Sequence, residues 1–472
     1  MAARLSTCLL AALAYNQSAV VTPSSSNYNS SLTIYNLNIP ILPAAVTYPS
    51  TTEEVSGIVK CAAEGNYKVQ AKSGGHSYGN YGWGGESGEV VINLANLNGF
   101  SYDNSTGHAT VGAGSRLGSV TTALYNSGER AVAHGSCPDV GIGGHATIGG
   151  VGPTSRQWGA TIDHVVSATV VLADGRIVTV SETENPDLFW ALKGAGGSFF
   201  VVTEFVFRTE AAPAGGVSYT YAFRGLNATA QAQVFKDFQT FISNSSLSWE
   251  LYIMMVGLPT VIEVTGAFFG SLEDFNAIGL EQAFSITPLA NVTVIPNWLD
   301  MVAIWATESE TAERPAYFYA KSLDVLPDAL LSDDTIDSMF EYLTTTPDDA
   351  LTYELEVQLV SGAMAETASN ATAFPHRDVL YWIFAYAATN GTVSNTTIDF
   401  LDGFNDVIYS AFPNETFYAY AGYVDPLLSK GPELYWADNL PRLEQIKREY
   451  DEHDVFHNPQ SVPVVDSDGC GW

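Results

Sequence analysis

The sequence predicts a fold of two domains that combines α-helices with β-strands. Helical and strand patterns alternate through the first 210 residues, and a stretch rich in Ala, Pro and Gly follows at 211–216. From there to about Tyr423 the chain is rich in aromatic residues and strand patterns, and the tail after residue 425 is helical again. A chain of 472 residues is long enough for two or three domains. We expect two, and the tail could belong to either.

Several elements of the first domain have recognisable ends. Thr51 and Glu54 have the spacing of a capping box, which predicts a helix that runs from there to Gly65. The alternation of apolar residues and the turn residues between them predict the other elements. These are strands at 67–71 and 199–207, a hairpin at 165–180, a short helix at 186–193 and a tail helix at 436–447.

The composition narrows the possible partners. Lys and Arg number 19 against 51 Asp and Glu, which gives a net charge of −32 at pH 7. This acidity disfavours nucleic acid, because phosphate binding needs Lys and Arg to displace counterions, and it equally disfavours anionic membranes. The sequence has no apolar run of about 18 residues, so no transmembrane helix is expected. We expect a globular chain that is monomeric and binds neither nucleic acid nor membrane.

Sequons suggest the compartment. Asn-x-Ser/Thr occurs at Asn16, Asn29, Asn104, Asn227, Asn244, Asn291, Asn370, Asn390, Asn395 and Asn414. Their spread along the chain favours a secreted protein with N-linked glycans, although fortuitous sequons in a cytosolic protein remain an alternative. The apolar stretch 9–14 behind Arg4 resembles a weak signal peptide, but we favour a mature start, in which Cys8 could pair with another cysteine.

No metal site is expected from the sequence. The four cysteines have no CxxC spacing, which disfavours a structural zinc site. His453 and His457 stand four residues apart, but no third ligand is evident near them in the sequence.

Three Gly-rich segments, at 72–79, 137–145 and 149–153, point to a phosphate-containing cofactor. Glycine permits positive φ and close backbone approach, so that successive N–H groups can face a pyrophosphate. A Rossmann fold would need a strand before Gly141 and a helix after it. Pro153 and the repeated glycines oppose that helix, so we reject the Rossmann fold.

Together these segments resemble the FAD-binding domain of the vanillyl-alcohol-oxidase superfamily and, within it, the berberine-bridge-enzyme-like branch. The motifs Gly-Gly-His-Ser at 74–77 and Cys-Pro-x-Val-Gly-x-Gly-Gly-His at 137–145 are complete. The similarity covers the first 210 and the last 50 residues. It implies an α+β fold in which 1–210 and 425–472 form the FAD-binding domain. Residues 211–424 would form a substrate-binding domain, built on an antiparallel sheet backed by helices.

The resemblance implies FAD held by two covalent bonds, to His76 and Cys137. Two tethers suit an open groove for long substrates. The resemblance also implies a disulfide between Cys8 and Cys61, which leaves Cys470 unpaired in the tail. The other residues expected at FAD are Ser73, Gly74, Gly75, Ser77, Tyr78, Gly79, Gly135, Ser136, Gly141, Gly143, Gly144, His145, Gly149, Gly150, Gly152, Val202, Asn458 and Gln460.

Within this branch the chain looks most like the fungal oligosaccharide oxidases, through the segment 418–425. Tyr423 matches the catalytic base of these enzymes. A phenol has a pKa of about 10, so Tyr423 needs a neighbour or the flavin to ionise. Related enzymes place Gln and Asp two residues apart to assist, whereas Glu356 and Gln358 stand here in the reverse order. Alternate residues of a strand share a face, so both could line the site, and which of them assists Tyr423 stays open.

The resemblance therefore implies Tyr423, Glu356 and Gln358 as catalytic residues. Tyr78, Tyr420 and Tyr381 are expected to bind the sugar together with Glu356 and Gln358. A structural role for Glu356, as a polar residue on a strand, remains an alternative.

The function implied is a secreted flavin oxidase of oligosaccharide reducing ends. Tyr423 would take the proton of the C1 hydroxyl while hydride passes to flavin N5. The resulting lactone hydrolyses to an aldonic acid, and O2 is reduced to H2O2. Three alternatives stay open: a dehydrogenase of the same fold that uses another redox acceptor, an oxidase of a secondary metabolite, and a non-catalytic sugar-binding flavoprotein.

Overall fold

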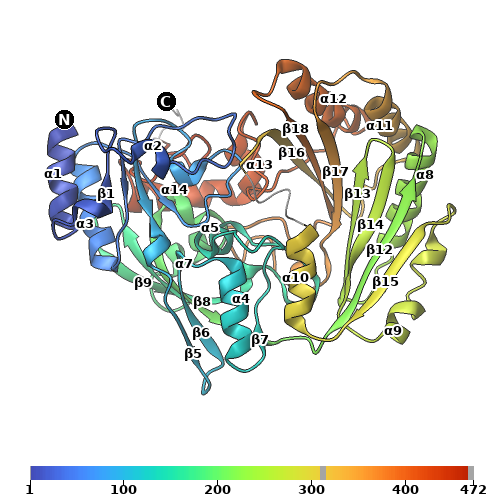
Figure 1. Cartoon of the computed structure of the whole chain (residues 1–472), viewed down its shortest axis with the longest axis horizontal. Helices are drawn as coiled ribbons and strands as arrows, with labels where there is room; N and C mark the ends of the chain where they lie inside the picture. Colours follow the sequence, from blue (N-terminus) through green and yellow to red (C-terminus); the bar gives the residue numbers. More distant parts are fainter. Residues whose placement is uncertain (1, 309–314, 466–472) are drawn as a thin grey trace.

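The computed structural model describes residues 2–308 and 315–465, which fold around two large hydrophobic cores that lie side by side (Figure 1). The first core draws on residues 5–207 and 435–462, and the second on residues 217–408. The chain passes from the first core to the second between residues 207 and 217, and back between residues 408 and 435. These passages lie near the boundaries expected at 210 and 425, although Ala373 and Ala419 belong to the first core. Cys470 lies outside the described residues. The expected two-domain α+β fold is confirmed.

A small sheet and a helical pair form one side of the first domain. The sheet has the order β1 (Val20–Val21), β2 (Ala45–Thr47), β4 (Val90–Asn93), β3 (Val69–Lys72), with β2, β4 and β3 parallel. Helix α3 (Thr52–Glu64) begins where the capping pattern predicts, since the Thr51 side chain accepts a hydrogen bond from the Glu54 N–H. The predicted strand at 67–71 is β3, shifted by one or two residues.

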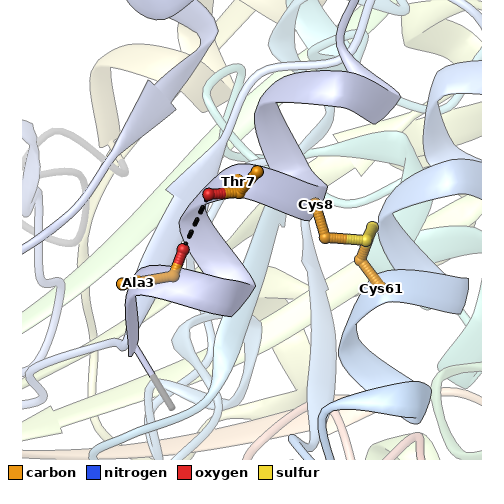
Figure 2. The surroundings of a disulfide bond; sticks show 4 residues. All are labelled: Ala3, Thr7, Cys8 and Cys61. Carbon is orange, nitrogen blue, oxygen red and sulfur yellow. Dashed lines mark hydrogen bonds between the residues drawn. A yellow bond between two sulfur atoms is a disulfide. The ribbon is translucent and has the colours of Figure 1, made fainter.

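A disulfide joins the first helix, α1 (Ala2–Ala12), to α3 (Figure 2). It links Cys8 to Cys61, as the resemblance implies. Leu5 and Leu9 on α1 and Leu13 directly after it recur every four residues, and all three are buried in the first core.

An antiparallel sheet of five strands completes the first domain. Its order is β5 (Phe100–Asp103), β6 (His108–Gly112), β10 (Phe200–Arg208), β8 (Val165–Leu172), β9 (Ile177–Ser181). The predicted hairpin is β8 and β9, and the predicted strand at 199–207 is β10. Other elements of this part are α2 (Tyr28–Ser31), α4 (Leu117–Asn126), β7 (Arg130–Ala131), α5 (Ile142–Ile148), α6 (Ser155–Trp158), α7 (Pro186–Ala195) and β11 (Glu210–Ala211).

The second domain is an antiparallel sheet of seven strands. The order is β15 (Leu289–Ile295), β12 (Gly216–Arg224), β14 (Val261–Phe268), β13 (Leu251–Leu258), β17 (Thr352–Leu359), β18 (Tyr381–Thr389), β16 (Tyr317–Val325). Helices α8 (Ala228–Ile242), α11 (Asp333–Thr345) and α12 (Asn395–Ala411) cover one face and enclose the second core (Figure 1). The other face is turned towards the first domain, with α10 (Trp298–Glu308) at its margin. Helix α9 (Leu272–Ala277) lies beside β12.

The tail returns to the first domain, where its red ribbon lies among the blue and green elements (Figure 1). It contains α13 (Gly431–Trp436) and α14 (Leu440–Tyr450). Beyond α14, the Val69 N–H donates to the Val455 carbonyl at 2.7 Å, so the tail lies against β3. None of the described helices is long and apolar enough to cross a membrane.

A buried ion pair fixes the tail. The Lys447 ammonium has no exposed surface, and it donates to the Asp451 carboxylate at 2.7 Å and to the carbonyls of Ser198 and Phe456 at 2.8 Å each. These three bonds satisfy the ammonium, which also lies within ion-pair distance of Asp454 Oδ1, at 3.0 Å. They join α14 to the chain before β10.

Replacement of Lys447 by Ala is expected to lower the free energy of unfolding by about 3–5 kcal/mol, because it leaves the Asp451 carboxylate buried without a counter-charge. Urea denaturation followed by circular dichroism measures this change. Arg176→Ala is the control, since it breaks the exposed pair with Asp174 and should cost no more than about 1 kcal/mol. Equal losses in the two variants would contradict a structural role for the buried pair.

Candidate active site

Five of the predicted site residues come together between the two domains. His76 and Tyr78 lie in the loop after β3, Glu356 and Gln358 lie on β17, and Tyr423 lies in the segment between α12 and α13. The rings of Tyr78 and Tyr423 are stacked, with centroids 6.4 Å apart. The first domain therefore presents the predicted flavin-linking loop directly to the predicted catalytic tyrosine of the second.

The two flavin motifs touch through their glycines. A Cβ added to Gly74 would lie 2.3 Å from the Gly141 nitrogen, and one added to Gly141 would lie 2.0 Å from the Gly74 nitrogen. Ser73 beside them donates to the Ala113 carbonyl at 2.6 Å and accepts from the Gly143 N–H at 3.4 Å. No larger residue fits at either glycine, so the motif that carries His76 and the motif that carries Cys137 are held against each other.

His76 is a neutral imidazole at neutral pH. Burial, reinforced by the positive charge of Arg116, lowers its pKa to about 4. Its ring lies 4.7 Å from the ring of Tyr35. A neutral imidazole keeps a nitrogen lone pair, which a bond to a flavin carbon requires.

His145 positions the turn before Cys137. Its Nε2 accepts a hydrogen bond from the Gly135 N–H at 3.0 Å, and burial lowers its pKa to about 3. The ring is therefore neutral and carries its proton on Nδ1. His145 acts on Gly135 and on the Ser136–Cys137 turn through the backbone rather than through a charge.

Tyr420 anchors the third Gly-rich segment. Its hydroxyl accepts from the Gly150 N–H at 2.9 Å, and the side chain is only 4% exposed. Gly152 in the same segment is packed tightly, since an added Cβ would lie 2.0 Å from the His134 carbonyl oxygen. The sequence predicts that Tyr420 binds the sugar, but its hydroxyl is directed instead to the cofactor loop.

The remaining residues predicted at FAD surround these loops. Ser77 accepts from the Tyr81 N–H at 3.2 Å, and Val202 lies in β10, buried in the first core. In the tail, Asn458 accepts from the Gln460 N–H at 3.0 Å, and Gln460 donates to the Asp425 carbonyl at 2.8 Å. Contact with FAD stays a prediction for these residues and for Gly75, Gly79, Gly144 and Gly149. A Cβ on Gly144 would meet no atom within 4 Å, which leaves open space beside the loops.

The structure decides which neighbour touches Tyr423. The Tyr423 hydroxyl donates to Gln358 Oε1 at 3.3 Å. Glu356, two residues earlier on the same face of β17, acts on Tyr423 through its charge. Burial, and then Glu356, raise the pKa of Tyr423 well above 10, so its phenol is protonated in the protein without substrate.

Glu354 is a site residue that the sequence analysis missed. It also lies on the face of β17 that carries Glu356, and the two carboxyl groups share a hydrogen bond. Burial raises the pKa of both groups, and the charge of Glu354 raises that of Glu356 further. The pair therefore binds a proton more tightly than a lone glutamate does, and the shared hydrogen bond favours that proton on Glu356. The sequence held a signal for this residue, because Glu354 stands two residues before Glu356 and alternate residues of a strand share a face.

Aromatic rings form the wall beside Tyr423. Phe384 on β18 lies 4.7 Å from Tyr423 between ring centroids, and Tyr78 lies 5.1 Å from Phe318. Tyr35 and Tyr386 complete this group. Such a wall offers flat apolar surfaces to a sugar ring or to an aromatic molecule.

Tyr381 does not belong to this site, and its expected role in sugar binding disagrees with its position. It lies on the opposite face of β18, fully buried in the second core, where its hydroxyl donates to Gln239 Oε1 at 2.5 Å. Its neighbour Trp382 is on the face turned to the first domain. The helices on one side of the sheet decide which of the two faces is interior, and the sequence of β18 does not show this.

Comparison with known proteins shows the family of the chain. Residues 43–181 match the family described as FAD binding domain, and residues 419–463 match the family described as berberine and berberine like. The chain is 40% identical to the FAD-linked oxidoreductase sorD of Penicillium rubens, over 98% of this chain and 99% of that one. It is 35% identical to a chitooligosaccharide oxidase of Gibberella zeae, over 91% and 89%.

A solved structure of glucooligosaccharide oxidase from Acremonium strictum superposes with a TM-score of 0.89. It is 31% identical, and the match covers 98% of this chain and 99% of that one. That enzyme is described as carrying a 6-S-cysteinyl, 8α-N1-histidyl FAD.

The Glu354–Glu356 pair is expected to make stability depend on pH. Because the folded state raises the pKa of Glu356 above its usual 4.5, folding takes up a proton, and stability falls as pH rises above that value. Glu356→Gln removes this loss. The difference in melting temperature, variant minus native protein, should therefore grow as the pH is raised from 4 to 8. Glu415→Gln, at an exposed loop position, controls for the loss of one carboxyl group. A difference that is the same at every pH would contradict the shared proton.

Proposed function

The chain belongs to the berberine-like FAD-linked oxidoreductases, and from this we propose that it oxidises the anomeric hydroxyl of oligosaccharide reducing ends. Oxygen is the electron acceptor and H2O2 the second product. The observation that carries the proposal is the Tyr423 side chain, whose hydroxyl is held by Gln358 and whose ring stacks on Tyr78 of the loop that carries His76. The chitooligosaccharide and glucooligosaccharide oxidases that this chain resembles support the substrate class.

We propose that FAD is attached covalently to His76 and Cys137. The neutral imidazole of His76, the contact between Gly74 and Gly141, and the open space at Gly144 fit such a cofactor. The charge of Cys137 contributes to the raised pKa of both Tyr78 and Tyr423, which are affected mainly by burial, so the thiol lies near the same rings. When bound, FAD supplies the hydride acceptor.

Tyr423 is proposed to accept the proton of the C1 hydroxyl. Its own proton must first leave, and the amide of Gln358, which holds it, is not a base at neutral pH. Its raised pKa makes the Glu354–Glu356 pair a better proton acceptor than a lone glutamate, and Glu356, when ionised, is close enough to raise the pKa of Tyr423. We assign the pair as the acceptor of this proton, and Gln358 as the residue that orients the phenol. This deprotonation leaves Tyr423 ready to take the substrate proton.

A second function, the oxidation of an aromatic secondary metabolite, is favoured by the hydrogen-bond partner of Tyr423 and by the aromatic wall beside it. Tyr423 touches an amide rather than a carboxylate, and the nearby wall is made of Tyr35, Tyr78, Phe318 and Phe384. The 40% identical relative is named only as an FAD-linked oxidoreductase. Turnover of cello-, xylo- and chito-oligosaccharides, compared with turnover of phenolic compounds, separates the two functions. Peroxide release in air, compared with reduction of a dye without oxygen, separates an oxidase from a dehydrogenase.

Secretion with N-linked glycans is part of the proposal. All ten sequon asparagines are exposed, which glycan attachment requires. A mass loss after enzymatic deglycosylation of the protein from its natural host tests this point, and an unchanged mass would contradict it.

The flavin is expected to remain with the protein after acid precipitation. A covalent cofactor cannot dissociate when the fold is lost, so the pellet should keep the yellow absorption. His76→Ala and Cys137→Ala should each retain flavin through the other bond, and only the double variant should release it. Colour that appears entirely in the supernatant of the native protein would overturn the covalent attachment.

Tyr423→Phe is expected to lower kcat on the preferred oligosaccharide by about 10²–10⁴-fold, because it removes the group that takes the substrate proton. KM should change little, since the ring remains. Steady-state peroxide assays measure both constants. Tyr381→Phe is the matched control: it removes a tyrosine hydroxyl on the far face of the sheet and should leave kcat within about twofold. Unchanged kcat in Tyr423→Phe would remove the proposed mechanism.

A further inference from the structure

Three potential metal ligands meet in the first domain, beside the tail residues predicted at FAD but not among them. Glu86 and Glu89 lie between η2 (Tyr81–Trp83) and β4, and His457 lies in the tail. One donor atom from each residue lies within 4.8 Å of the other two. The sequence analysis discounted a metal because it found no ligand near His457. Glu86 and Glu89 are far from His457 in the sequence, and folding brings them beside it.

Glu89 is the feature of this cluster that most needs a cation. The residue is 4% exposed, and its Oε2 is buried without any hydrogen-bond partner. A carboxylate oxygen removed from water and left without a donor is costly, and a bound metal ion satisfies it.

His457 is oriented as a metal-binding histidine. Its Nδ1 donates to Asp454 Oδ2 at 2.7 Å, which leaves Nε2 as the nitrogen with a lone pair. Asp454 is itself held by Lys68 and Lys447, at 3.0 Å each. Burial opposes ionisation, but the bonds from His457 and Lys447 keep the pKa of Asp454 below its usual range. A carboxylate behind a histidine is the common second layer of metal sites in proteins.

We propose that Glu86, Glu89 and His457 bind one divalent metal ion of the zinc class, with water completing the coordination. Two carboxylates and a neutral imidazole carry a charge of −2, which such an ion neutralises. The imidazole favours zinc over calcium or magnesium, which prefer sets of oxygen ligands.

The ion joins the tail to the segment after His76, between η2 and β4. Beside the cluster, the His457 carbonyl accepts from Gln70 of β3 at 2.7 Å, and Pro459 packs against Gly85 so closely that an added Cβ would lie 2.5 Å from its ring. Zinc has no redox chemistry, so the role assigned here is structural. The ion links the two chain segments of the FAD-binding domain, 1–210 and 425–472. This role does not depend on which substrate the enzyme uses.

The test is a calorimetric titration of Zn²⁺ into the flavin-containing protein after treatment with a chelator. One equivalent should bind, and the melting temperature should rise with Zn²⁺. Glu89→Gln and His457→Ala should each lose this binding and this shift. His453→Ala is the matched control, because that histidine is four residues away with a side chain 83% exposed, and it should bind like the native protein.

The variants must be folded for the comparison to hold, and circular dichroism without metal establishes this. If Glu89→Gln does not fold, Glu86→Gln replaces it, because Glu86 is exposed and tolerates the change. Failure of the native protein to bind one equivalent would overturn the proposal. Equal binding by His457→Ala and His453→Ala would also overturn it, and Glu89 would then be a protonated buried acid.

Discussion

The position of the whole site depends on a backbone contact between Gly74 and Gly141. Since a Cβ at either residue would overlap the other backbone, the two loops meet at a distance that only glycine permits. His76 follows one of these glycines by two residues, and Cys137 precedes the other by four. The same loop carries Tyr78, whose ring reaches Tyr423 of the second domain. The contact thus fixes the relative position of the two cofactor loops, and Tyr78 of one loop in turn contacts Tyr423 on the substrate side.

The period of two along a strand sets the other half of the site. On β17 the side chains of Glu354, Glu356 and Gln358 point to the first domain, while Leu355 and Val357 between them enter the second core. On β18 the same alternation turns Trp382 and Phe384 to the first domain. One face of the sheet therefore packs in the second core, and the other lines the site. A shift of register by one residue would move each side chain to the opposite face.

Local signals made most of the first domain predictable. The cap at Thr51, the hairpin β8–β9 and the two flavin motifs each depend on residues close together in sequence, and the structure has them where they were expected. Long-range arrangements were harder. Tyr381 was assigned to the wrong face because the covering helices lie elsewhere in the chain. Glu354 was overlooked, and Glu86, Glu89 and His457 meet only because the tail returns to the neighbourhood of β4.

The return of the tail also has a consequence for biosynthesis. The first core needs residues from both ends of the chain, and Lys447 places its ammonium against the Ser198 carbonyl. Among the described residues, the second core and the side chains packed against it lie within 217–417. On the ribosome, therefore, the residues of the second core are all made before the set for the first core is complete, because the first core lacks its tail residues 435–462 until synthesis is almost finished. FAD can be enclosed only after this step, so cofactor insertion belongs to the last stage of maturation.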